Sequence, residues 1–274
     1  MVPGLAVDPH VTAKLADWLA KGERVVVVRV TSVKGSAPRG HDAVMGATET
    51  DMAGTIGGGQ LEWLALDHAR KMLAGKPEAR KLDIPLGPEI GQCCGGRVEL
   101  EFSRLDDKVM ESLAGEANEA ERGMKQVLVF GAGHTGKALA NALAPLPLKA
   151  VLVDSRAEAF DGFASPIATK LTALPEEIVR SAAPGSAFVT MTHDHSLDFL
   201  ITAEALRRGE GAYVGMIGSA TKRALFMNWL EDNGHGRDLG DSLTCPIGGS
   251  AVKDKRPEVI AALTAAEILG VLAK

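Results

Sequence analysis

The sequence predicts an α/β protein, with a doubly wound parallel sheet in its C-terminal half and a separate α+β domain before it. Three observations predict this fold class. From residue 126 onward, short apolar runs of strand character alternate with helical segments, which is typical of parallel βαβ units. Residues 1–104 instead combine two helical segments with strand-like runs separated by glycine-rich turns. Residues 105–124 are charged and rich in alanine, which suits a solvated connecting helix between a domain 1–104 and a domain 125–274.

Composition and charge exclude several classes of protein. The chain has 274 residues, enough for about two domains, and its formal net charge of −5 comes without a dense lysine or arginine run. We therefore expect no nucleic-acid partner. The N-terminus lacks a basic segment followed by an apolar core, and no apolar run reaches about 18 residues, so we expect neither a secretion signal nor a membrane partner. Three cysteines, two of them adjacent, fit free thiols in a reducing compartment and predict a cytoplasmic protein.

The first domain is predicted to begin with a helix that leads into a buried strand. Within residues 9–21, Val11, Leu15 and Trp18 recur at helical spacing on one face. The elements predicted after it are a β-branched strand at 23–33, strand-like runs at 43–48 and 52–57, a helix within 57–75 and an alternating strand at 97–102.

A glycine-rich loop precedes the second helix of this domain and is a candidate phosphate cradle. Unpaired amides and the helix dipole attract anions at such a position, the dipole contributing about 0.3–1 kcal/mol. A turn that only needs positive φ angles explains the same glycines. The nearby turn at 34–40 carries Lys34, Ser36 and Arg39, which form either an anion grip or a solvated hairpin. The residues of the predicted cradle are Gly57, Gly58, Gly59 and Gln60.

Cys93 and Cys94 are adjacent and directly precede Gly95 and Gly96. Neighbouring Cα atoms lie about 3.8 Å apart, whereas a relaxed disulfide spans about 4.4–6.8 Å, so a disulfide between the two is disfavoured. Zinc is disfavoured too, because no familiar ligand spacing is present. A thiol beside glycine amides and Arg97 can act as a nucleophile, a soft-metal ligand or a sulfur carrier. The alternative is a pair of small buried apolar side chains.

The second domain opens on a strand, followed by glycines in the spacing G-x-G-x-x-G and then by a helix. In this context Gly131 permits a tight turn, Gly133 lets backbone approach a phosphate, and Gly136 lets helix and strand pack closely. Asp154 ends the next strand, where an acidic side chain accepts hydrogen bonds from a ribose hydroxyl. These residues predict a Rossmann-like domain with an NAD-like site. The alternative is an inherited scaffold without a working nucleotide site.

The predicted strand order brings three loops of the second domain to one crevice. In the usual doubly wound order the first and fourth strands are neighbours, and the fifth lies beside the fourth, so the loops after them converge. The crevice would collect imidazoles, a carboxylate, a hydroxyl, two cations and helix amides, which suits a phosphorylated anionic ligand. The predicted strands are 126–130, 149–154, 187–192 and 212–218, with helices from 134, near 175–182, at 196–209 and at 219–232. The predicted site residues are His134, His193, Asp194, His195, Ser219, Lys222 and Arg223.

The stretch His193, Asp194, His195 is also consistent with a metal site or with a helix cap. Imidazole and carboxylate are common metal ligands, but two histidines two positions apart are a weak signal alone. In an extended stretch they point the same way, whereas in the first turn of a helix they diverge. We favour contact with a ligand over a metal site, and capping of the following helix by Asp194 is the remaining alternative.

Several motifs in one order resemble the XdhC/CoxI family across nearly the whole chain: GSAPR, GTIGGG, QCCGGRVEL, GAGHTG, VDSR, THDHSLD, GMIGSATKR, and PIGG followed by KRPEVIAALTAAEIL. The resemblance implies an N-terminal XdhC/CoxI domain and a C-terminal Rossmann domain. It also implies a cytoplasmic chaperone, not an enzyme, that binds the molybdenum cofactor (molybdopterin). The chaperone would hold the cofactor while a cysteine desulfurase replaces a molybdenum oxygen by a sulfido ligand, and would then deliver it to apo xanthine dehydrogenase.

The resemblance also assigns roles to the unusual residues. Cys93 and Cys94 would contact molybdenum through the cofactor, and the two anion-friendly regions suit the pterin phosphate. A homodimer fits such a pair of domains. One departure is the segment 250–254, where relatives have a shorter and more regular connection between Pro-Ile-Gly and Lys-x-Pro-Glu.

Two further functions account for part of the sequence. An NAD(P)-dependent oxidoreductase would use the glycine fingerprint and Asp154 for the nucleotide, and His193 or His195 as acid or base. It predicts saturable NADH binding but leaves the paired cysteines unexplained. A purely structural interaction module leaves the glycine loops unexplained.

Overall fold

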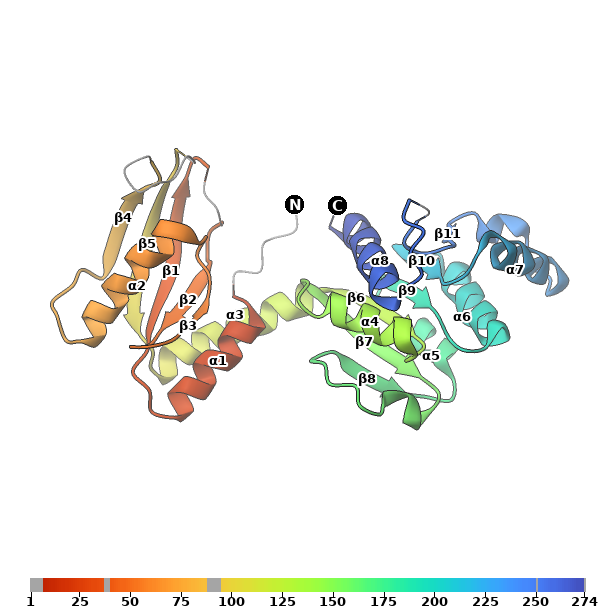
Figure 1. Cartoon of the computed structure of the whole chain (residues 1–274), viewed down its shortest axis with the longest axis horizontal. Coiled ribbons are helices and arrows are strands. Elements are labelled where there is room, and N and C mark those ends of the chain that lie inside the picture. The colour runs from red at the N-terminus through yellow and green to blue at the C-terminus, as the bar shows by residue number, and fades with distance from the viewer. Residues whose placement is uncertain (1–6, 37–39, 88–94, 250, 274) are drawn as a thin grey trace. The chain divides into compact units, whose positions relative to one another are not determined.

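The computed structural model describes residues 7–36, 40–87, 95–249 and 251–273. The chain divides between Gly123 and Met124 into two compact units, each of which is described by itself (Figure 1). Of the predicted site residues, Arg39, Cys93 and Cys94 lie outside the described residues.

The first unit contains an antiparallel sheet with helices on both faces (Figure 1). Its elements are α1 (Pro9–Ala20), β1 (Val26–Lys34), β2 (Val44–Ala47), β3 (Met52–Gly54), α2 (Gly59–Leu73), β4 (Lys81–Pro85), β5 (Arg97–Arg104) and α3 (Asp107–Gly123). The strands lie in the order β3-β2-β1-β5-β4. In the valine run at the start of β1, Val26 and Val28 pack with α2. Val27 and the preceding Val25 pack with α1 and α3 on the other face. Successive positions are apolar because both faces are covered.

The helix α3 is anchored on the first unit. The two terminal nitrogens of Arg29, in β1, donate to the two carboxylate oxygens of Glu116 at 2.8 and 3.0 Å. Leu113 and Ala117 are buried in the same cluster as residues of α1. The segment 105–124, predicted as a solvated connecting helix, thus has an apolar stripe that packs inside this unit.

The second unit contains a parallel six-stranded sheet in the order β11-β10-β9-β6-β7-β8 (Figure 1). Counted within the unit this is the order 6-5-4-1-2-3, so the Rossmann-like prediction is confirmed. Its strands are β6 (Lys125–Phe130), β7 (Leu148–Asp154), β8 (Ala168–Leu171), β9 (Ala187–Thr190), β10 (Tyr213–Met216) and β11 (Leu243–Thr244). Its helices are α4 (His134–Leu143), α5 (Pro175–Ser181), α6 (His195–Arg208), α7 (Ala220–Asp232) and α8 (Pro257–Leu272), with short 3₁₀ turns at Ala157–Phe160 and Arg237–Gly240.

The first strand of this sheet shows how the two layers of helices are held. In β6, Val127 and Val129 pack with α4 and α8, whereas Leu128 and Phe130 pack with α5, α6 and α7. The strand order changes direction between β6 and β9, where the loops after neighbouring strands run to opposite faces. This is the position at which open α/β sheets bind ligands.

The last helix, α8, is tied to the sheet through Glu267. Its carboxylate accepts hydrogen bonds from the Tyr213 hydroxyl at 2.7 Å and from the Gly248 amide at 2.9 Å. Burial and the Glu267 carboxylate both raise the pKa of Tyr213, so this hydroxyl remains a donor. Within the described ranges, no helix is long and apolar enough to cross a membrane.

Candidate functional site

The glycine fingerprint forms the turn between β6 and α4. Gly131 has a φ of 112°, which favours glycine, and its missing Cβ faces the carbonyl of Met191. The missing Cβ of Gly136 faces the carbonyl of Gly131, so a side chain there would push α4 away from the turn. Gly133 has a φ of −75°, and apart from its own atoms and its two chain neighbours no described atom lies within 4 Å of the position its Cβ would take. The first and third glycines therefore serve packing, and the second faces free space.

The N-terminus of α4 differs from those of α6 and α7, because no described side chain caps it. Asp194 caps α6 by accepting the amide hydrogen of Ser196 at 2.8 Å, as its capping role requires. Ser219 caps α7 by accepting the amide hydrogen of Lys222 at 3.3 Å. The first-turn amides of α4 carry the positive end of the helix dipole without such a partner.

A buried ion pair ties together the loops after β9 and β10. Asp198, in the first turn of α6, accepts hydrogen bonds from the Thr192 amide at 2.8 Å and from the Lys222 ammonium at 2.5 Å. Asp198 is 0% exposed and Lys222 is 9% exposed. Lys222 therefore neutralises Asp198, and a ligand would have to compete for it. Asp198 is not among the residues predicted from the sequence, although it is an acidic residue in the first turn of a predicted helix.

The three histidines are exposed near the carboxyl ends of β6 and β9. His134 begins α4 and His195 begins α6, while His193 precedes the capping residue, so His193 and His195 do not share an extended stretch. Among the described residues, no group of three or more His, Cys, Asp or Glu side chains could hold a metal ion. Arg223 is half-buried and donates to the carbonyl of Gly240 at 3.2 Å.

Asp154 is hydrogen-bonded on both carboxylate oxygens. Oδ2 accepts from the Ala132 amide at 2.7 Å and from Nη2 of Arg156 at 3.2 Å, and Oδ1 accepts from the amide and Nε of Arg156 at 3.0 and 3.1 Å. Burial acts to raise the pKa of this carboxyl, but the hydrogen bonds from Arg156 and the two amides outweigh burial and hold the pKa below its ordinary value. Asp154, predicted to accept hydrogen bonds from a ribose, is thus already hydrogen-bonded to groups of its own chain. Arg156 was missed from the sequence, although it follows Asp154 by two positions.

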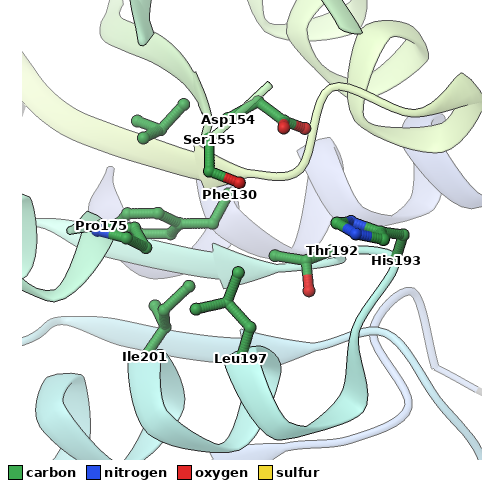
Figure 2. Close-up of a pocket in the computed structure, with 9 residues that line it drawn as sticks. Phe130, Asp154, Ser155, Pro175, Thr192, His193, Leu197 and Ile201 are labelled. Carbon is green, nitrogen blue, oxygen red and sulfur yellow. The ribbon is translucent and has the colours of Figure 1, made fainter. Parts of the chain in front are cut away.

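A small pocket adjoins Asp154 (Figure 2). Figure 2 shows Asp154, the last residue of β7, and Ser155 on one side and Leu197 and Ile201 of α6 on the other, with His193 at the edge. The interior volume is about 10 Å³, close to the space needed for a single water molecule. The other apolar side chains that line this pocket are Phe130, Val153 and Pro175.

Cys245 lies near the same loops, although it is distant in sequence. It follows β11, and its Sγ lies 3.9 Å from the carbonyl oxygen of Ser219. Burial raises the pKa of this thiol, and Lys222 and Arg223 oppose that effect. Cys245 is therefore held mainly as the thiol. Cys245 is not among the residues predicted from the sequence, because only the pairing of β11 with β10 brings it here.

The glycine loop before α2 holds a carboxylate of the chain itself. One oxygen of Glu62 accepts the amide hydrogens of Ile56, Gly57 and Gly58 at 3.0, 3.3 and 2.9 Å. The same oxygen accepts a hydrogen bond from the Thr55 hydroxyl. Successive amides that converge in this way form an anion-binding nest. The loop has the character of the predicted cradle, but a phosphate would have to displace Glu62.

The remaining predicted residues of the first unit lie in two places. Gly59 and Gln60 form the first turn of α2. Ser36 pairs with Gly95 in an isolated parallel bridge, and the missing Cβ of Gly96 faces the Ser36 carbonyl. The structure therefore brings together the turn after β1 and the glycine pair before β5, which are far apart in sequence.

Two family models match the chain. One, described as the XdhC Rossmann domain, covers residues 127–268, and the other, described as the XdhC and CoxI family, covers residues 18–83. A curated relative, the uncharacterized protein YqeB of Escherichia coli (strain K12), is 24% identical over an alignment of 259 positions that covers 89% of this chain and 43% of that protein. The chain thus spans less than half the length of that relative.

The fold is also similar to a solved structure. A crystal structure described as a xanthine dehydrogenase from Bacillus halodurans superimposes with a TM-score of 0.74 and 18% identity, over 96% of both chains. This similarity concerns the fold. Because the XdhC Rossmann model alone covers more than half of the residues, the chain belongs to the XdhC/CoxI family.

Proposed function

We propose that the protein carries the molybdenum cofactor during the maturation of a xanthine dehydrogenase. Membership of the XdhC/CoxI family supports a role connected with that enzyme, as does a relative of the same fold that is described as a xanthine dehydrogenase. The cofactor is the cargo of this protein. An apo xanthine dehydrogenase is the proposed recipient, and a cysteine desulfurase is the proposed sulfur donor. The homodimer and the cytoplasmic location stay predictions.

The N-terminus of α4 is the observation that carries this proposal. Its first-turn amides have no side-chain cap, and Gly133 leaves free space in front of them. The exposed imidazoles of His134 and His193 lie on the loops after the two neighbouring strands β6 and β9. Backbone amides at a helix N-terminus bind phosphate, and imidazoles can donate to it. The phosphate of a pterin cofactor suits this position.

Cys93 and Cys94 belong to the first unit and lie outside the described residues, and they stay candidate ligands for molybdenum, as the family resemblance implies. A thiolate is a soft ligand that suits both molybdenum and sulfur transfer. The described residues that follow them are held firmly: the Gly95 amide donates to the Leu86 carbonyl, and the Leu86 amide donates to the Gly96 carbonyl, both at 2.8 Å.

Cofactor retention tests the phosphate position. The protein is incubated anaerobically with molybdenum cofactor, bound and free cofactor are separated by gel filtration, and pterin and molybdenum are both quantified. Gly133→Val adds a side chain where φ is ordinary and space is free, so we expect about a tenfold loss of retention in a folded protein. Gly270→Val, at a glycine of α8 whose missing Cβ has no neighbour within 4 Å outside its own helix, is the matched control. Unchanged retention in Gly133→Val would rule out this phosphate position.

Retention also tests the role of the paired thiols. We expect the double variant Cys93→Ala, Cys94→Ala to retain less molybdenum and to activate less recipient enzyme, with its thermal unfolding unchanged. Cys245→Ala is the matched control, because its thiol is kept protonated by burial. A double variant that retains as much molybdenum as the wild type would remove the role assigned to the pair.

A further inference from the structure

We propose that Arg156 determines which ligands the Rossmann crevice accepts, by closing the position where ribose would bind. In dinucleotide-binding Rossmann domains, an acidic residue at the end of the second strand accepts hydrogen bonds from the ribose hydroxyls. Asp154 occupies that place, and Arg156 holds it. The crevice therefore gains nothing from a ribose diol, and it disfavours NAD and NADP. The inference rests on the proposed function only for the identity of the ligand that is accepted.

Asp154 has a limited number of acceptor positions, and the chain itself occupies them. A carboxylate offers about four lone-pair positions. The Ala132 amide, the Arg156 amide and two guanidinium nitrogens of Arg156 take four, at 2.7 to 3.2 Å. The Asp154 side chain is also only 3% exposed. A ribose diol would therefore find no acceptor unless the guanidinium moved away.

The pair between Arg156 and Asp154 also disfavours NADP. A free arginine near this position would accommodate the 2′-phosphate of that nucleotide. Arg156 is not free in this sense, because its Nε and Nη2 form a bidentate pair with Asp154. A 2′-phosphate would have to break this pair and would then lie beside a carboxylate of like charge. The pair therefore disfavours both nucleotides.

The pocket beside Asp154 is small. A base attached to a ribose at this position would extend past Ser155, toward Leu197 and Ile201 (Figure 2). The enclosed space between these residues is about 10 Å³, enough for one water molecule, so the pocket offers a purine ring little buried contact. This observation is independent of the hydrogen bonds of Arg156, and it leads to the same selectivity.

Two sugar phosphates that differ in one hydroxyl isolate the ribose position. Ribose 5-phosphate and 2-deoxyribose 5-phosphate both carry a phosphate and neither has a base, so the small pocket beside Asp154 does not affect the comparison. Their dissociation constants are measured by calorimetry or ligand-observed NMR. We expect a ratio of about one for the wild type. We expect Arg156→Ala, which leaves Asp154 two amide donors and frees two acceptor positions, to prefer ribose 5-phosphate about tenfold.

Three controls complete the design. The double variant Arg156→Ala, Asp154→Asn should lose the preference, because the freed carboxylate is gone. Arg180→Ala removes an exposed arginine paired with Glu204 in the same unit and should leave the ratio at about one. NADH and NADPH should show no saturable binding to the wild type.

Several results would overturn the inference. They are saturable binding of NADH or NADPH by the wild type, a wild-type preference for the ribose compound, and a folded Arg156→Ala variant that shows no preference or binds neither sugar phosphate. Failure of the proposed function is seen separately, because it appears as absent retention of molybdenum cofactor by the wild type. A carrier role could thus fail while the effect of Arg156 on sugar discrimination stands.

Discussion

Two glycine-rich loops, one in each unit, precede a helix and look alike in sequence, yet they treat their backbone amides differently. In the loop before α2, one oxygen of Glu62 accepts three successive amides and a hydroxyl. Among the amides of the loop before α4, only that of Ala132 donates to Asp154, and no side chain caps the amides in the first turn of the helix. The first loop is filled by its own chain, and the second can take a foreign anion.

A glycine-rich loop before a helix predicts that backbone amides converge, but it does not predict which anion they bind. The glycines make the amides converge, and this holds in both loops. Whether the anion is internal depends on an acidic residue that can reach back. Glu62 stands four residues after Gly58, in a variant of the capping box. In α4 the residues at matching positions are not acidic, so the site depends on a ligand.

Substitution of the packing glycine should give the largest effect. In Gly136→Val the side chain would overlap the Gly131 carbonyl, and we expect the second unit to lose about 4 kcal/mol or more of its free energy of unfolding. Gly133→Val, three residues earlier, should change stability by less than about 1 kcal/mol. Hydrogen exchange of β6 amides measures both. Equal losses in the two variants would show that the loop lacks the division of roles described above.

Removal of the internal anion should give the next largest effect. In Glu62→Ala the amides of Ile56, Gly57 and Gly58 lose their acceptor, and we expect the first unit to be destabilised by about 2–3 kcal/mol. Sulfate should restore part of this loss in the variant and have little effect on the wild type. Glu119→Ala, on the exposed face of α3, is the matched control. A variant that sulfate does not stabilise would argue against an anion-binding nest.

Acid should have the smallest effect, and it should act on the second loop. The pKa of Asp154 is lower in the folded protein than in the unfolded chain, so its contribution to stability is full above the ordinary carboxyl pKa of about 3.9. That contribution declines as the pH falls through the folded pKa. Between pH 5 and 3, the free energy of unfolding measured with urea should therefore fall more steeply with decreasing pH in the wild type than in Asp154→Asn. Asp254→Asn, which removes a half-buried carboxyl whose pKa is lowered by hydrogen bonds from Arg256, controls for other ion pairs.

The sequence predicts the fold well wherever an element is long and its burial follows a simple rule. β6 is buried on both faces and reads as an apolar run, and the glycine spacing after it predicts the turn. β8 escapes prediction because all four of its residues are exposed, and β11 because it has two residues. α8 is apolar on all sides, so it lacks the periodicity that marks a surface helix.

The candidate site was predictable in its location and less so in its chemistry. Strand order alone places the loops after β6, β9 and β10 together, and the structure has that order. Hydrogen-bond partners depend on side-chain directions that no spacing reveals. Lys222 looks like a free cation in sequence, but it is paired with Asp198, 24 residues away. Asp154 looks like a free acceptor, but Arg156 folds back on it.

Hydrogen exchange with and without molybdenum cofactor tests the central comparison most directly. Amide exchange is followed at the two loops under anaerobic conditions, with enough cofactor to saturate any site. We predict slower exchange in the first turn of α4, from Gly133 to Gly136, and unchanged exchange at Ile56, Gly57 and Gly58. Protection at the loop before α2 without protection at α4, or no protection at either loop, would contradict the account.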